Sequence, residues 1–220
     1  MKRDWTEALW AVFFPKQCPF CGKTIPRREL CCADCGGALP WLREERELPG
    51  LDGAFIPFSY EGGPEAAVRR LKFHGCTGRA RSLAPYLAGA LEGERFDCIV
   101  PIPMSRKGKR RRGYNQAELL ARFLSHETGI PWEPALEKVR ETAEQHTLSA
   151  RERRGNLKGA YRLRNGAAAA GRSILLCDDV ATTGATFREA AETLRRAGAS
   201  RVAAAAVCKT RRSGPEGGAA

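Results

Sequence analysis

The chain has 220 residues, of which 28% are charged and 43% hydrophobic, a composition typical of globular proteins that excludes an intrinsically disordered chain. No stretch approaches the roughly 20 apolar residues that span a bilayer, so we expect no membrane span. The formal net charge is +12, and residues 69–115 hold twelve Lys and Arg against three Asp and Glu, a local net of +9. Such a segment favours polyanions, but charge alone does not choose among phosphorylated metabolites, nucleic acid and an anionic membrane surface.

Residues 1–50 are predicted to form an amphipathic helix ended by Pro15, followed by a small cysteine module. The start of the chain carries acidic residues and lacks a small-residue cleavage site, which argues against a signal peptide. We therefore expect a cytoplasmic protein, whose nine cysteines are metal ligands or buried thiols before disulfides.

The cysteine module contains two C-x₂-C pairs, Cys18 with Cys21 and Cys32 with Cys35, separated by ten residues. Each pair can turn two thiolates toward one tetrahedral ion, and four cysteines complete a structural Zn²⁺ site. Cys31 could replace Cys32, but Cys32 restores the x₂ spacing. A redox dithiol is the alternative. Four thiolates leave Zn²⁺ no open position, so we assign this site no catalysis.

Residues 51–212 are predicted to form an α/β domain, with a helical lead-in at 51–96 and a core at 97–212. In chain order we expect a linker at 48–53, a strand at 54–60, helices at 64–73 and 79–91, a buried strand at 97–102, a basic loop, a helix at 114–125, a long loop at 141–158, strands at 159–163 and 173–177, a helix at 185–197 and a strand at 202–208. Strands that alternate with helices indicate a mostly parallel sheet. Residues 213–220 are expected to be a disordered tail.

The segment 174–186 carries the clearest functional pattern. An apolar strand is followed by two carboxylates, Asp178 and Asp179, at the edge where open α/β sheets bind ligands. A short turn and the start of a helix come next, and Gly184 lets the backbone approach a phosphate. Three hydroxyls add to this anion cradle: Thr182, Thr183 and Thr186. Carboxylates beside a phosphate cradle suit sugar hydroxyls, so the pattern predicts a ribose 5-phosphate. The alternative is a plain strand end and helix cap.

This segment resembles the signature by which type I phosphoribosyltransferases bind 5-phosphoribosyl-1-pyrophosphate (PRPP). The resemblance implies that Asp178 and Asp179 hold the ribose hydroxyls as the catalytic acids. It also implies a set of residues around the 5-phosphate: Val180, Ala181, Thr182, Thr183, Gly184, Ala185 and Thr186. Cys177 departs from the usual aliphatic residue, but a buried thiol behaves as a small apolar group.

Two further segments resemble parts of the same site. Val100-Pro-Ile-Pro103 is similar to the pyrophosphate loop of this superfamily, which implies that Pro101, Pro103 and the cations Lys107 and Arg112 meet pyrophosphate and its Mg²⁺. The segment 145–158 is similar to the flexible loop that closes over PRPP, which implies roles for Arg151 and Lys158. The alternatives are a solvated basic face and an ordinary surface loop.

The order of motifs over residues 10–210 resembles the competence protein F family. The motifs are the four-cysteine module, Leu71-Lys-Phe, Val100-Pro-Ile-Pro, Arg112-Gly-Tyr-Asn-Gln-Ala, Leu148-Ser-Ala and the PRPP signature. The resemblance implies a type I phosphoribosyltransferase fold with an N-terminal zinc-ribbon-like module. It also implies a link to DNA uptake and natural transformation, with single-stranded DNA and DNA-processing proteins as partners.

Two functions fit these observations. The first is a phosphoribosyltransferase that transfers phosphoribosyl from PRPP to a nitrogen acceptor, which the sequence does not name, with release of pyrophosphate. The second is a non-catalytic module that binds nucleic acid or a partner and keeps the PRPP pocket for sensing or for structure.

Overall fold

The computed structural model of the chain describes residues 15–42, 47–73, 78–140 and 158–210. The strands are β1 (Ala54–Phe55), β2 (Phe58–Ser59), β3 (Cys98–Pro101), β4 (Leu136–Lys138), β5 (Tyr161–Leu163), β6 (Ser173–Ala181) and β7 (Arg201–Lys209). The helices are α2 (Ala33–Gly37), α3 (Gly62–Phe73), α4 (Gly78–Ala90), α5 (Arg106–Arg112), α6 (Gln116–Thr128) and α8 (Ala185–Arg196). Among these helices, none is long and apolar enough to cross a membrane.

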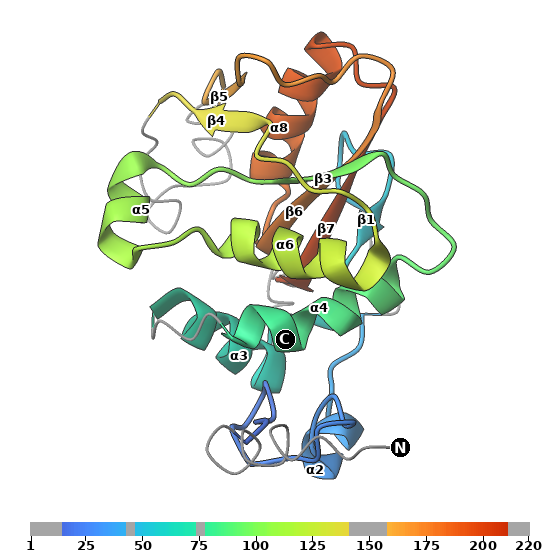
Figure 1. Cartoon of the computed structure of the whole chain (residues 1–220), viewed down its shortest axis with the longest axis vertical. Coiled ribbons are helices and arrows are strands. Elements are labelled where there is room, and N and C mark those ends of the chain that lie inside the picture. The colour runs from blue at the N-terminus through green and yellow to red at the C-terminus, as the bar shows by residue number, and fades with distance from the viewer. Residues whose placement is uncertain (1–14, 43–46, 74–77, 141–157, 211–220) are drawn as a thin grey trace, which may run out of the picture.

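The main sheet has five strands in the order β1-β7-β6-β3, with β2 also paired to β7. Every one of these pairings is parallel, which confirms the α/β architecture with a parallel sheet. The two long strands pair from Ser173 with Arg201 to Ala181 with Lys209. A separate antiparallel pair, β4 and β5, lies beside α8 (Figure 1).

Helices cover both faces of the sheet, so its central strands β6 and β7 are apolar over most of their length and carry charged residues only near their ends. On one face, Ile174 and Leu176 of β6 belong to the core cluster that α8 completes with Phe187. On the other face, Leu175 and Cys177 join the cluster formed with α3, α4 and α6. Neighbouring residues of β6 therefore point to opposite faces, which decides how the acids at its end are oriented.

The cysteine module lies at one end of the molecule, with α3 and α4 between it and the sheet (Figure 1). Aromatic rings join the two parts: Phe20 of the module meets Phe58 edge-on, with ring centroids 5.8 Å apart, and lies 5.5 Å from Tyr86. The segment 48–53, expected as a linker, also packs on the domain, because Leu48 is buried in the α8 cluster.

Four elements differ from the sequence expectation. The strand expected at 54–60 is divided into β1 and β2. Strand β6 continues through both acids to Ala181, because β7 pairs with it along its whole length. The expected basic loop contains α5, whose first turn is capped by Ser105 and whose end is Gly113 in the left-handed region. Repulsion between neighbouring cations disfavours such a helix, but cations near its C-terminus interact well with the helix dipole. Strand β4 carries no alternating pattern and was not expected.

Other expectations concern residues that the structure does not describe. The N-terminal helix, most of the long loop and the disordered tail fall in 1–14, 141–157 and 211–220, outside the described residues.

Candidate functional site

The two acids, Asp178 and Asp179, lie within β6 near its carboxyl end; we call them the acid pair. Because successive strand residues alternate, Asp178 lies on the α8 face of the sheet and Asp179 on the α3 face. The backbone N–H of Asp179 donates to Oδ1 of Asp178 at 2.8 Å. The acid pair therefore straddles the sheet edge and can present oxygens to one ligand from both sides.

The turn between β6 and α8 follows at the same edge of the sheet. Gly184 is the N-cap of α8 with φ 73°, a left-handed conformation that suits glycine. A Cβ at this position would lie 3.1 Å from Cδ2 of Leu48, so the turn is also closely packed against that side chain. The N–H groups of the first turn of this 12-residue helix are donors of the kind that can bind an anion.

The acid pair and the turn line one cavity of about 400 Å³. Residues expected at the site supply more than half of its lining: Asp178, Asp179, Val180, Thr182, Gly184 and Thr186. Ala181, Thr183 and Ala185 belong to the same segment, although they do not line the cavity. The remaining lining residues were not expected: Tyr60, Lys72, Phe187 and Thr210.

Lys72 of α3 is the most informative of these additions. Its Nζ lies 3.1 Å from Oδ1 of Asp179, and the two side chains are 23% and 8% exposed. Burial acts to lower the pKa of Lys72, but the carboxylates of Asp179 and Asp178 raise it above its ordinary value. The ammonium group therefore stays charged beside the acid pair.

The pKa of Asp178 is raised from 3.8 to about 7. Burial is the main cause and the charge of Asp179 the second, while Lys72 and Lys138 act in the opposite direction. Two adjacent carboxylates in a partly buried cavity repel each other, so the site favours a ligand that donates hydrogen bonds to them.

The segment that resembles a pyrophosphate loop begins directly beside the acid pair. Pro101 pairs in register with Cys177, the residue before Asp178, and the N–H of Ile102 donates to the carbonyl of Cys177 at 2.9 Å. Pro103 follows in the connection to α5.

The two cations expected there both lie on α5. Lys107 is exposed, and Nη1 of Arg112 donates to Oε1 of Gln116 at 3.3 Å. Neither of them lines the cavity in this structure.

The expected closing loop is described only at its end. Arg151 lies outside the described residues, and Lys158 is exposed just before β5. The N–H of Gly159 donates to Oε1 of Glu189 on α8 at 2.6 Å, so the end of this segment is fixed to the helix that follows the turn.

Two of the unexpected lining residues follow strands. Tyr60 comes directly after β2 and Thr210 directly after β7, and both strands end at the same edge as β6. The rule that ligands bind at the carboxyl edge of parallel strands could have identified them. Lys72 had no such signal, because it lies in the last turn of a helix.

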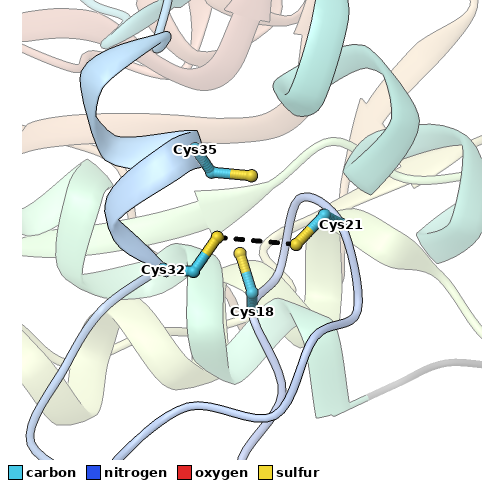
Figure 2. Close-up of side chains that lie close together, drawn as sticks. All are labelled: Cys18, Cys21, Cys32 and Cys35. Atoms are coloured by element: carbon cyan, nitrogen blue, oxygen red, sulfur yellow. Dashed lines mark hydrogen bonds between the residues drawn. The ribbon is translucent and has the colours of Figure 1, made fainter.

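The four expected metal ligands converge in the cysteine module. The sulfur atoms of Cys18, Cys21, Cys32 and Cys35 all lie within 4.8 Å of one another, and Cys21 Sγ is 3.6 Å from Cys32 Sγ. Figure 2 shows one pair on a loop and the other at α2, with the sulfur atoms turned toward a common centre. Zn–S bonds of about 2.3 Å in a tetrahedron separate sulfur atoms by roughly 3.8 Å, so this set fits a metal ion.

Comparisons with known proteins identify related chains. Residues 74–217 match the family described as "Phosphoribosyl transferase domain". DNA utilization protein YhgH of Salmonella typhi is 34% identical over 88% of this chain and 90% of its own. Competence protein F of Haemophilus influenzae is 32% identical over 83% of this chain and 81% of its own. A solved adenine phosphoribosyltransferase from Thermoanaerobacter pseudethanolicus is 18% identical, covers 61% of this chain and 82% of its own, and has a TM-score of 0.40.

Proposed function

Because the chain belongs to the competence protein F family and carries its phosphoribosyl transferase domain, we propose that it binds PRPP at the acid pair and the turn before α8. The observation that supports this proposal is that carboxylates and an anion-binding helix start line a single cavity. A ribose 5-phosphate needs both groups in one cavity: acceptors for its hydroxyls and N–H donors for its phosphate.

The chemistry that follows is transfer of the phosphoribosyl group. The acid pair accepts hydrogen bonds from the ribose hydroxyls and fixes the sugar, while the turn holds the 5-phosphate. A nitrogen lone pair of the acceptor forms a bond to C1 as the bond from C1 to pyrophosphate breaks, through an oxocarbenium-like transition state. Mg²⁺ bound with PRPP would supply counter-charge for the leaving pyrophosphate. The cations of α5 follow the carboxyl end of β3, the strand that pairs with β6.

The decisive experiment for PRPP binding removes both charges of the acid pair. We expect Asp178→Asn with Asp179→Asn to abolish PRPP binding in calorimetry while the protein stays folded. The matched control, Glu29→Gln with Glu92→Gln, neutralises two exposed acids away from the cavity and should bind like the unaltered protein. Unchanged PRPP affinity in the Asp variant would contradict the assignment.

Turnover needs a separate measurement. The protein is incubated with PRPP, Mg²⁺ and a panel of nucleobases, and pyrophosphate release is followed. Release that depends on one base and on the acid pair would support the transferase. PRPP binding without release would support a role of the pocket in sensing.

We infer a biological role in DNA uptake from the relatives, which are named for DNA utilization and competence. On this proposal the protein acts in the cytoplasm, with single-stranded DNA and DNA-processing proteins as partners. The cysteine module would hold one structural Zn²⁺.

A second candidate function, a non-catalytic nucleic-acid-binding module, is favoured by α5. Six of its seven residues are cations, most of them exposed, and they lie on one short helix beside the site. Contacts to backbone phosphates would make affinity fall steeply with salt. We expect Lys107→Gln with Arg110→Gln to weaken single-stranded DNA binding and to reduce the salt slope, by about one for each phosphate group that the variant no longer binds.

The matched control for this experiment is Arg122→Gln with Arg196→Gln, which removes two exposed cations from α6 and α8. An equal loss of affinity in both variants would indicate a general charge effect, and DNA binding that does not depend on salt would contradict the proposal.

A further inference from the structure

The last turn of α3 is a junction between three separate parts of the molecule. Nη1 of Arg70 donates to the carbonyl of Phe20 in the cysteine module at 2.9 Å. The carbonyl of the next residue, Leu71, accepts from the hydroxyl of Tyr114, which lies between α5 and α6, at 2.5 Å. The residue after that, Lys72, pairs with Asp179. Three consecutive residues thus connect the module, the segment between α5 and α6, and the acid pair.

Lys72 is the cation that the acid pair needs. Without it, two adjacent carboxylates in one cavity would each oppose the ionisation of the other. Its Nζ lies 3.1 Å from Asp179, close enough to offset much of that repulsion in a partly buried site. A ligand that donates hydrogen bonds to the acid pair binds its ionised form more tightly, because charged acceptors form the stronger hydrogen bonds, so the position of Lys72 bears directly on binding.

The cysteine module contacts α3 at both of its ends. Near the first turn, a Cβ on Gly63 would lie only 2.9 Å from Cβ of Phe20, so only glycine allows this approach. At the last turn, Arg70 binds the carbonyl of the same Phe20. On α4, Nη1 of Arg79 donates to the carbonyl of Pro19 at 2.7 Å. Both carbonyls lie between Cys18 and Cys21, the first pair of candidate metal ligands.

We propose that Lys72 is a positioning residue that keeps the acid pair ionised and turned into the cavity, and that the cysteine module holds Lys72 there through α3. The step to ligand binding rests on the proposed function. The effect on the acid pair itself does not, because it concerns contacts already present without ligand.

Several other groups face the acid pair or Lys72 and enter any titration of the site. Those that interact with the acid pair or Lys72 directly are Tyr60 after β2, Lys138 on β4, Tyr161 on β5, Cys177 on β6 and Cys208 on β7, and those that interact with these neighbours are Glu65 and Arg69 on α3 and Glu189 on α8. All of them stay in place in the variants below, so differences between variants report the substituted residue.

The test is the titration of the acid pair in the ligand-free, metal-loaded protein, followed by carboxyl ¹³C NMR. We expect Lys72→Met to raise the higher apparent pKa of the pair by about one pH unit or more, since an opposite charge at this distance typically shifts a carboxyl by 1–3. Lys72→Arg keeps the charge and should restore the profile. Arg70→Met should also raise the higher apparent pKa of the pair, by a smaller amount than Lys72→Met. Arg81→Met, which removes an exposed cation from α4, should leave it unchanged.

Two outcomes would overturn the proposal. A titration in Lys72→Met equal to that of the unaltered protein would refute the role of Lys72. If the acid pair titrates in Arg70→Met as it does in Arg81→Met, and the amide NMR spectrum is otherwise native, the proposal that the module holds Lys72 in place through α3 is refuted.

A second experiment measures the binding of ribose 5-phosphate by calorimetry at pH 6 and pH 8. A shift of about one pH unit lowers the ionised fraction of the acid pair about tenfold at pH 6 but only about twofold at pH 8, so we expect Lys72→Met to weaken binding by about these factors. The same loss of affinity at both pH values would contradict the charge-setting role. Absence of binding in the unaltered protein would instead refute the proposed function and leave the ligand-free titration as the test of this inference.

Discussion

Replacing Asp178 with Asn should make the protein more stable in neutral and alkaline solution. Its folded-state pKa, about 7, lies above the ordinary value of 3.8. The folded protein therefore holds this proton more tightly than the unfolded chain. The stabilisation from the proton is complete below about pH 3.8 and is lost as the pH rises through 7. Because Asn does not titrate, the stability of the variant does not decrease in this way as the pH rises.

The size of the effect follows from the two pKa values. Linkage with values of 3.8 and about 7 gives a loss of about 2 kcal/mol between pH 5.5 and pH 8.5 in the unaltered protein. We therefore expect the free energy of unfolding of Asp178→Asn, relative to the unaltered protein, to rise by about 2 kcal/mol over this range. Urea unfolding followed by tryptophan fluorescence in the presence of Zn²⁺ measures it at each pH.

Asp52→Asn is the matched control for this prediction. The side chain of Asp52 is 43% exposed; what burial it has acts to raise its pKa, but the N–H of Val202 and the guanidinium of Arg195 hold that pKa below the ordinary value. Its stabilisation is therefore complete above pH 5.5, and the control should show a constant loss of stability over the whole range. The reasoning about Asp178 would be refuted by a difference that stays constant with pH or that falls as the pH rises.

Two other predictions concern the metal module and the phosphate turn. Cys35→Ser should lose bound zinc, whereas Cys31→Ser should retain one ion per chain, because Cys31 does not belong to the cluster of four sulfur atoms. A zinc-binding dye measures the zinc that each variant releases. Equal release from both variants would count against this set of ligands. Gly184→Ala should lower stability by roughly 2–3 kcal/mol in thermal unfolding, because it combines a left-handed backbone with contact to Leu48. Gly166→Ala has a similar φ but no neighbour within 4 Å and should cost only about 1 kcal/mol, so equal destabilisation would refute the crowding argument.

The sequence predicted the parallel α/β domain well because its signals are local. Apolar runs with helical segments between them define β3, β6, α8 and β7, and the structure has each of them near the expected bounds. The limits of β6 were the exception. Two acids look like the end of a strand, but pairing with β7 continues the strand through them. Helix α5 formed where a basic loop was expected, with Ser105 capping its start and Gly113 in the left-handed region at its end.

The sequence by itself determined the acid pair, the turn that follows it and the two C-x₂-C pairs, because each is a set of residues whose chemistry is fixed by short spacing. Only the tertiary structure decided what surrounds them. Lys72 reaches Asp179 because α3 packs on one face of the sheet, and Phe20 meets α3 because the module folds back on the domain. Contacts between residues far apart in the chain depend on how helices pack, and the spacing of residues within a short segment does not predict that packing.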